Sequence, residues 1–285
     1  MTHLPTLAVT GSTGAVGSLV ARELADAGVP LRLLVRDAAR APELPGAAVV
    51  TTSYDDPGAR DALRGVRTLF MVSGSESVDR VRQHLAFVDA AVAAGVEHVV
   101  YTSFYGAAPD ATFTLARDHY ATEQHVRASG MGFTFLRDNL YLDFIPAMVG
   151  DDGVIRGPAG QGRVAAVARA DIAAVAVTVL GDPAAHEGAT YDLTGPEALT
   201  LAEAAAVITA ACGTDVTFHD ETLAEAYASR KRWLAPDWQY DAWVSTYTAI
   251  AAGELAGATD HVARLTGRPP ISLAEYLAGQ DRPTT

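Results

Sequence analysis

Three glycines, Gly11, Gly14 and Gly17, follow the apolar run Leu7–Val9 at intervals of three residues. A helix-favouring run, Ser18–Ala27, comes next. Strand, glycine turn and helix in this order are the context that a dinucleotide-binding fingerprint requires. The first glycine permits a sharp turn, the second lets the backbone approach a pyrophosphate, and the third lets the helix pack closely. Glycine turns also join ordinary strands to helices, so the prediction depends on this whole context.

The helix after the turn would offer free backbone N–H groups and a positive dipole end to phosphate oxygens. Two hydroxyl side chains in the turn could add hydrogen bonds. The predicted phosphate-binding residues are Gly11, Ser12, Thr13, Gly14, Ala15, Val16 and Gly17.

The end of the second apolar run, Leu31–Val35, carries the residues that would select the cofactor. Arg36 follows the run directly, Asp37 comes next, and Arg40 is close behind. An acidic residue here binds a ribose 2′-OH and indicates NAD, whereas an arginine accommodates the 2′-phosphate of NADP. Because Arg36 comes first, the order favours NADP. The alternative is a solvated Arg36 beside an Asp37 that caps the next turn.

Further polar and small residues follow the later strands, where ligands bind in such sheets. The segment 53–56 could border an adenine, although its residues also suit a turn. We expect the cofactor to contact Ser73, Gly74, Ser103 and Phe104, and we expect Asn139, Tyr141 and Phe144 to border a substrate pocket. Asn139 could equally cap a helix, and Phe144 could be core.

The elements that must position these residues alternate regularly. Strands are expected at 31–35, 47–51, 63–72, 98–102 and 133–136, with helices near 77–94 and 112–128. Such alternation predicts an α/β fold, a doubly wound Rossmann parallel sheet covered on both faces. We expect an NADP-binding domain at 1–150 and, after the irregular Gly150–Gly162, a smaller and mostly helical substrate-binding region at 151–285. Within it, 165–195 would pack back on the first domain, and Thr200 with Glu203 would form a capping box.

Composition excludes several functional classes. The chain has 285 residues, 21 Lys and Arg against 34 Asp and Glu, and a net charge of −13, which argues against nucleic-acid binding. Cys212 is the one cysteine, so no intrachain disulfide is possible. No leader-like start and no membrane-length apolar stretch is apparent, so we expect a cytoplasmic protein that does not bind membranes. The scattered Asp and His residues predict no metal site.

Several segments together resemble the NmrA-like branch of the atypical short-chain dehydrogenase/reductases. They are TGSTGAVG (10–17), LVRD (34–37), YTS (101–103), LARDHYATE (115–123) and FTFLRDNLYLDF (133–144). The likeness is strongest to the triphenylmethane reductases and NADPH:quinone oxidoreductases of this branch, and it weakens after about residue 195. Ser53 departs from the pattern, because these relatives usually carry an aspartate there.

The proton donor of ordinary short-chain dehydrogenases, Tyr-x-x-x-Lys, is missing from its usual helix. Its tyrosine position holds Leu115 and its lysine position holds His119. The resemblance implies that His119 faces the ligand, where it could bind the ribose or shuttle a proton near neutral pH. The alternative is a structural histidine. Tyr227 and Lys231 match the motif by spacing, but they lie far along the chain, and we interpret the match as coincidence.

Without that donor, hydride transfer is expected to favour an acceptor that is already electron-poor. The sequence therefore predicts an NADPH-dependent reductase of quinone-like, cationic or otherwise conjugated acceptors, with His119, Asn139 and Tyr141 at the reacting site. The second hypothesis is a non-catalytic NADP(H)-binding redox sensor that acts through protein partners, as in some NmrA-like proteins. An isomerase or dehydratase is a weaker third hypothesis, because it would also need the tyrosine.

The C-terminal region carries an aromatic cluster formed by Trp233, Trp238, Tyr240, Trp243 and Tyr247. It could face an aromatic substrate, but its pattern is more typical of a small helical core or of a contact in a homodimer. The charge run Arg230–Arg232 predicts a solvated face.

Overall fold

The computed structural model describes residues 4–280, and the chain forms two compact units. The units are interleaved along the sequence, so a single boundary at residue 150 does not separate them. The first unit consists of the chain up to Phe104, Asp118–Arg137 and Arg169–Tyr191. The second consists of Tyr105–Arg117, Asp138–Ala168 and the chain from Asp192 onward.

Within residues 4–280 the main sheet has seven strands in the order β3-β2-β1-β4-β5-β6-β9. The strands are β1 (Leu7–Thr10), β2 (Leu31–Val35), β3 (Ala47–Thr51), β4 (Thr68–Met71), β5 (His98–Phe104), β6 (Gly132–Asp138) and β9 (Thr190–Leu193). β1 pairs in parallel with β2 and β4, and Val9 lies opposite Leu33 and Phe70. The chain order reverses at β1, and ligands bind at such a switch point in parallel sheets.

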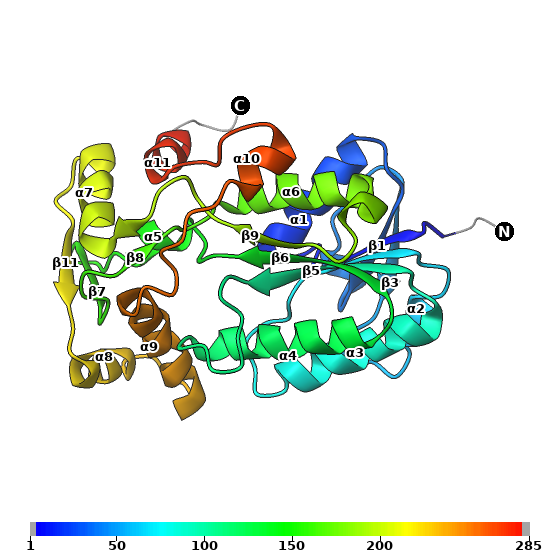
Figure 1. The fold of residues 1–285 in the computed structure, drawn as a ribbon, viewed down its shortest axis with the longest axis horizontal. Coiled ribbons are helices and arrows are strands. Elements are labelled where there is room, and N and C mark those ends of the chain that lie inside the picture. The colour runs from blue at the N-terminus through cyan, green and yellow to red at the C-terminus, as the bar shows by residue number, and fades with distance from the viewer. Residues whose placement is uncertain (1–3, 281–285) are drawn as a thin grey trace. The chain divides into compact units, whose positions relative to one another are not determined.

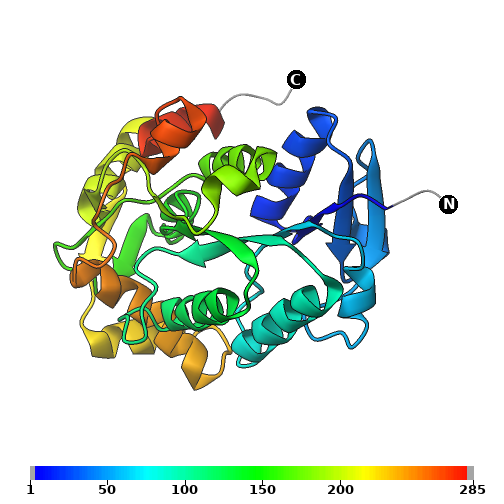
Figure 2. The same cartoon turned by 45° about the vertical axis from the view of Figure 1, so that its right-hand side comes forward.

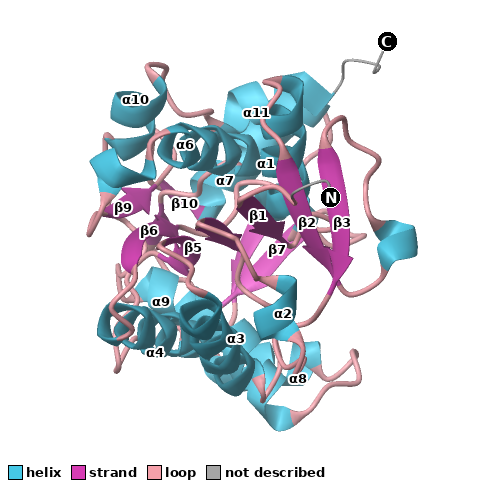
Figure 3. Ribbon diagram, turned by 90° about the vertical axis from the view of Figure 1, so that its right-hand side faces the viewer, coloured by secondary structure: helices cyan, strands magenta, loops and turns pink. Residues whose placement is uncertain are grey.

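Helices cover both faces of this sheet in the first unit. They are α1 (Ala15–Asp26), α2 (Ala59–Ala62), α3 (Arg80–Ala94), most of α4 (Thr114–Ala128) and α6 (Arg169–Gly181), with the 3₁₀ turns η1 (Ala38–Arg40) and η2 (Pro183–His186). α1 packs against α6 on one face, and α3 and α4 lie on the other (Figures 1 to 3). The predicted doubly wound fold is therefore confirmed.

The core under α3 explains why the strands read as continuous apolar runs. Leu69 and Met71 of β4, Tyr101 of β5 and Phe135 of β6 are fully buried together with Phe87 of α3. A strand covered on both faces has no solvated side, so apolar residues occupy both of its faces. α3 ends where predicted, because Gly95 takes a left-handed conformation with φ 81°.

The second unit contains short strand pairs and helices. Its elements are α5 (Phe144–Ala147), β7 (Val154–Gly157), β8 (Arg163–Val164), β10 (Leu199–Thr200), α7 (Leu201–Cys212), β11 (Thr217–Asp220), α8 (Leu223–Arg230), α9 (Asp237–Ala251), α10 (His261–Thr266) and α11 (Leu273–Gln280). β7 pairs in parallel with β11, and α7 packs beside β11 (Figure 1). The predicted capping box is present, since Thr200 and Glu203 exchange backbone-to-side-chain bonds of 2.9 and 3.1 Å.

Two local predictions are wrong. The strand expected over 63–72 occupies only Thr68–Met71, because 63–67 turns after α2 before entering the sheet. The segment Gly150–Gly162 is not irregular throughout, since it contains β7, whose partner β11 lies about sixty residues further along the chain. None of the helices in the described part of the chain has the length and apolar character to cross a membrane.

Candidate cofactor and active site

The glycine turn leaves no room for side chains at two of its three glycines. Gly11 has φ 64°, and a Cβ there would lie 2.9 Å from Cβ of Val72. A Cβ at Gly17 would lie 2.3 Å from the carbonyl oxygen of Gly11. The turn is closed by the Gly14 N–H, which donates to that same oxygen at 2.8 Å. The roles expected for Gly11 in turning and for Gly17 in close packing match this geometry.

The turn also presents unused polar groups. Ser12 is 1 % exposed, and its Oγ has no hydrogen-bond partner among the described residues. Gly14 caps the twelve-residue α1 without a side-chain hydrogen bond, while Thr13, Gly14 and Ala15 are exposed. A buried hydroxyl without a partner is costly unless a ligand completes it, and a helix N-terminus favours anions. The turn therefore fits the pyrophosphate of a dinucleotide.

Arginine side chains line an open pocket beside this turn. The pocket has a volume of about 320 Å³ and is lined by Thr13, Arg36, Asp37 and Arg40. Asp37 has a local structural role, because its carboxylate accepts the Ala39 N–H at 3.0 Å and caps η1. No carboxylate of the described chain pairs with Arg36 or Arg40. The pocket thus fits a 2′-phosphate better than a 2′-hydroxyl.

The loop after β4 is held by hydrogen bonds from its backbone. The Ser73 N–H donates to Thr102 Oγ1 at 2.8 Å, and the Gly74 N–H donates to His84 Nε2 at 2.8 Å. A Cβ at Gly74 would lie 3.1 Å from that nitrogen. These bonds hold the loop backbone in place, and the small residues Ser73 and Gly74 leave room for a cofactor to lie against it.

Ser103 does not offer its hydroxyl to a ligand. Its Oγ donates to the carboxylate of Glu123 at 2.6 Å, and Glu123, which is fully buried, also pairs with Arg137 at 2.6 Å. The predicted cofactor contact through this side chain is thus replaced by a buried polar link between β5 and α4. Phe104, the next residue, places its ring 6.1 Å from that of His119.

His119 lies on α4 and is 6 % exposed. Its Nδ1 is 3.1 Å from the hydroxyl of Tyr101. Burial, with a smaller contribution from the Arg80 charge, lowers the pKa of His119 well below its usual range. The ring is therefore neutral at neutral pH, which corrects the expectation of a proton shuttle that titrates there. A neutral imidazole can still donate one N–H.

In the second unit, Asn139 has a structural role in place of the expected substrate contact. It is fully buried, its Nδ2 donates to the carbonyl oxygen of Leu255 at 3.0 Å, and its Oδ1 accepts the Leu140 N–H at 2.7 Å. It also opens no helix. Tyr141 stacks on Phe144 with ring centroids 5.8 Å apart, and Phe144 is 45 % exposed, so it is not core. These two rings form a stacked aromatic pair.

Asp138 is a functional candidate that the sequence reasoning missed. It is 2 % exposed, and its carboxyl group forms no ion pair within residues 4–280. Burial raises the pKa of Asp138 well above its usual range, and the Tyr141 side chain opposes this shift only in part. A buried carboxyl without an ion pair is a recognised sign of a functional site. Its position at the carboxyl end of β6, where ligands bind in parallel sheets, is the sequence feature that could have indicated this role.

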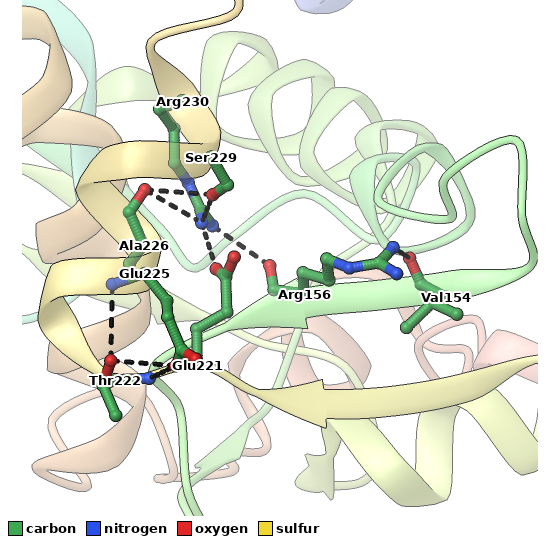
Figure 4. Close-up of polar contacts among 8 residues, drawn as sticks. All are labelled: Val154, Arg156, Glu221, Thr222, Glu225, Ala226, Ser229 and Arg230. Atoms are coloured by element: carbon green, nitrogen blue, oxygen red, sulfur yellow. Dashed lines mark hydrogen bonds and ion pairs between the residues drawn. The ribbon is translucent and has the colours of Figure 1, made fainter.

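In the charge run Arg230–Arg232, Lys231 and Arg232 are exposed as expected, but Arg230 is buried. Arg230 forms a buried ion pair with Glu221, and their side chains are 7 % and 3 % exposed. Its guanidinium also donates to the carbonyl oxygen of Arg156 at 3.0 Å, which joins α8 to β7 (Figure 4). The Arg230 guanidinium lies 4.9 Å from the centroid of the Tyr247 ring. The residues next to Arg230 in the sequence did not reveal this burial, because its partners come from β7, from the connection between β11 and α8, and from α9.

The side chains of Tyr227 and Lys231, which match the spacing Tyr-x-x-x-Lys, share no hydrogen bond within the described chain. The Tyr227 hydroxyl donates to Asp241 at 2.8 Å, and Lys231 is exposed at the end of α8. At the usual position of the motif, Leu115 is 7 % exposed and packs in the interior. In the aromatic cluster, Trp243 contacts the rings of Trp233 and Tyr240 edge-on.

A parallel sheet that reverses at β1, with a glycine turn and an arginine pocket beside that strand, defines a dinucleotide-binding α/β protein. The chain belongs to the NmrA-like family, whose model matches residues 4–229. The comparisons with named relatives make it an oxidoreductase of this family.

Relatives of similar length support this assignment. The chain is 37 % identical over 274 residues to an NAD(P)H azoreductase of Xenophilus azovorans, covering 94 % of this chain and 95 % of the relative. The structure of an NADPH-dependent quinone oxidoreductase of Escherichia coli, complexed with NADPH, superposes with a TM-score of 0.88 at 34 % identity and covers 97 % of this chain and 100 % of that one. The Citrobacter triphenylmethane reductase complexed with NADP(H) gives 0.85 at 31 %, covering 96 % and 99 %.

Proposed function

We propose that the protein is an NADPH-dependent reductase that transfers hydride to a quinone-like, cationic or otherwise conjugated acceptor. The observation that carries the proposal is the pair of residues in the usual proton-donor positions of α4. Leu115 is buried, and His119 is a buried neutral imidazole. Neither supplies the strong acid that a simple ketone needs. The azo, quinone and triphenylmethane reductases among the relatives bear names that agree with such acceptors.

The cofactor is NADPH in this proposal. Arg36 and Arg40 would hold the 2′-phosphate, and Ser12 with the N–H groups at the start of α1 would hold the pyrophosphate. Asp37, the residue that would select NAD, caps η1 and lies beside these two arginines. Two of the structural relatives were solved with NADPH or NADP(H), in agreement with this assignment.

Arg36→Ala tests the cofactor assignment. Loss of the guanidinium should weaken NADPH binding by roughly tenfold or more, since a charge-assisted bond to phosphate contributes about 1.5–3 kcal/mol. NADH binding should change by less than about twofold, because NADH lacks the 2′-phosphate. Calorimetric titration with both cofactors measures the difference. An equal loss for the two cofactors, or no loss for either, would show that Arg36 does not bind the 2′-phosphate.

When bound, NADPH supplies the hydride, and the protein supplies binding, orientation and exclusion of water. An electron-poor acceptor needs little further activation: a triarylmethyl cation takes the hydride alone, and a quinone takes the hydride and one proton to give the hydroquinone. Within the first unit, the neutral His119 can donate a hydrogen bond. Within the second unit, the stacked rings of Tyr141 and Phe144 are of a kind that packs against aromatic ligands.

The direct test follows NADPH oxidation with a benzoquinone, a naphthoquinone, a cationic triarylmethane dye and a simple ketone. We expect turnover with the first three and none with the ketone. Turnover of the ketone at a similar rate would contradict the absence of a strong proton donor. Calorimetric binding of NADPH with no turnover of any acceptor would instead favour the sensor hypothesis.

A further inference from the structure

A chain of buried polar side chains connects the Gly74 loop with His119. His84 of α3 and Tyr101 of β5 are both fully buried. The Tyr101 hydroxyl lies 3.4 Å from Nδ1 of His84 and 3.1 Å from Nδ1 of His119. Thr122 of α4 contacts Nδ1 of His84 at 3.0 Å. All of these residues belong to the first unit, so the chain is internal to one compact body.

The backbone at Gly74 determines which nitrogen of His84 carries the proton. A backbone N–H can only donate, so Nε2 of His84, at 2.8 Å, must be the acceptor. A neutral imidazole with an acceptor at Nε2 carries its proton on Nδ1. The Thr122 hydroxyl agrees with this assignment, because it donates to the carbonyl oxygen of Asp118 at 2.8 Å and is left to accept from His84.

The same logic extends through Tyr101 to His119. Because Nδ1 of His84 already carries a proton, it cannot accept the Tyr101 hydroxyl. Of the two imidazole nitrogens within reach, only Nδ1 of His119, at 3.1 Å, is left to accept that buried hydroxyl, and the Thr122 hydroxyl is its other polar neighbour. Leaving a buried hydroxyl unpaired is costly. With Nδ1 as the acceptor, His119 carries its proton on Nε2, for which the described chain provides no partner.

We propose that His84 and Tyr101 are positioning residues that fix His119 as an Nε2–H donor. The donor is directed at an oxygen acceptor of the bound nucleotide or of the reduced substrate. The proposal rests on the proposed reductase function for the use of this donor, but the tautomer itself is a property of the resting protein. Through His84 and Tyr101, the Gly74 N–H would thus influence the tautomer of His119, which it does not contact.

The surroundings keep both rings neutral, as the proposal requires. Burial, with a smaller contribution from Arg80, lowers the pKa of His84 to about 3 and also lowers that of His119. Arg80 is itself paired with Asp118 at 3.0 Å. Glu123, the other buried charge on α4, is neutralised by Arg137. Neither histidine therefore gains a proton from a neighbouring carboxylate.

Nitrogen-15 NMR of the whole protein tests the tautomers directly, without any acceptor. The long-range couplings of each imidazole distinguish a proton on Nδ1 from one on Nε2, and His84→Gln and His119→Gln variants assign the signals. We expect Nδ1–H for His84 and Nε2–H for His119 at pH 7. A proton on Nδ1 of His119, or an equal mixture in the wild-type protein, would overturn the proposal whether or not the enzyme reduces quinones.

Tyr101→Phe tests the link between the rings while preserving the packing of the aromatic side chain. We expect His119 to become a mixture of tautomers and turnover of a quinone to fall roughly fivefold, the equivalent of one positioning hydrogen bond. An equal fall with a cationic dye would assign the donor to the nucleotide, and a fall with the quinone alone would assign it to the substrate. An unchanged His119 tautomer would refute the role of Tyr101.

Tyr191→Phe is the matched control, since it removes a 2.8 Å bond between a tyrosine hydroxyl and His186 elsewhere in the same unit. It should leave His84, His119 and turnover unchanged. His84→Gln and His84→Asn separate the two bonds of His84, because glutamine can reach the Gly74 N–H and asparagine can reach Thr122. We expect asparagine to weaken NADPH binding by roughly fivefold and glutamine by less than about twofold. The reverse order would contradict the Gly74 link.

Discussion

The two units bury polar groups in different ways. In the first unit, both imidazole rings are neutral, and every ring nitrogen of His84 and His119 except Nε2 of His119 has an assigned partner. In the second unit, Arg230 and Glu221 form a buried ion pair, and Asp138 is buried without an ion pair among the described residues. The chain of neutral rings can present a directed hydrogen-bond donor to a ligand. The Arg230–Glu221 ion pair can only join elements of the fold, and the buried Asp138 carboxyl lowers the stability of the folded protein.

The ion pair predicts the largest effect on stability. Arg230→Met leaves Glu221 buried without a counter-charge, so the free energy of unfolding should fall by about 3–5 kcal/mol. Urea unfolding followed by circular dichroism measures it. The double variant Arg230→Met, Glu221→Leu should recover most of the loss, because replacing both charges removes the uncompensated one. A single variant as stable as wild type would show that the pair is solvated in solution.

The neutral histidines predict a loss of stability in acid. The unfolded chain binds a proton at each histidine near pH 6.5, whereas folded His84 does so only near pH 3. Stability is therefore complete above about pH 6.5 and falls as the pH decreases toward 3, by up to about 1.4 kcal/mol per pH unit for each ring. Unfolding midpoints between pH 7 and 4 measure the slope. His84→Gln should flatten it, and a slope equal to that of wild type would contradict the burial of a neutral His84.

Replacing Asp138 should increase the stability of the protein. The contribution of this residue depends on pH in the opposite direction to that of the buried histidines. Its raised pKa makes the folded state lose stability as the pH increases above about 3.8, the usual value for an aspartate. Asp138→Asn removes the charge and should stabilise the protein by roughly 1–3 kcal/mol at pH 8, with little gain at pH 4. Thermal unfolding at the two pH values tests this. A destabilised Asp138→Asn at pH 8 would mean that the carboxylate is charged and bound in the native state.

An exposed ion pair should have the smallest effect. Arg67 contacts Glu97 through two hydrogen bonds at 3.0 Å and one at 2.8 Å, but their side chains are 68 % and 58 % exposed. Solvent screens such pairs. Arg67→Met should therefore leave the unfolding midpoint unchanged, in contrast to Arg230→Met. A comparable loss from both substitutions would remove the distinction between buried and exposed pairs.

The sequence by itself determined the features that depend on nearby residues. The turn glycines, the strand and helix order, the C-cap at Gly95 and the capping box of Thr200 are all present as predicted. Arg36 at the end of β2 was also predictable, because the position follows directly from the end of an apolar run. Each of these depends on backbone conformation or capping within a few residues, so the local pattern contains the needed information.

Only the tertiary structure decided which polar side chains are available to a ligand. Ser103 lies near the end of β5 and Asn139 directly follows β6, as ligand-binding residues should, but Glu123 and Leu255 form hydrogen bonds with them. Arg230 looks solvated by its neighbours, yet its partner Glu221 and the carbonyl oxygen of Arg156 bury it. The protonation of His119 depends on Gly74, far away in sequence. Burial and hydrogen-bond partners arise from packing between distant segments, and a single sequence does not specify which segments meet.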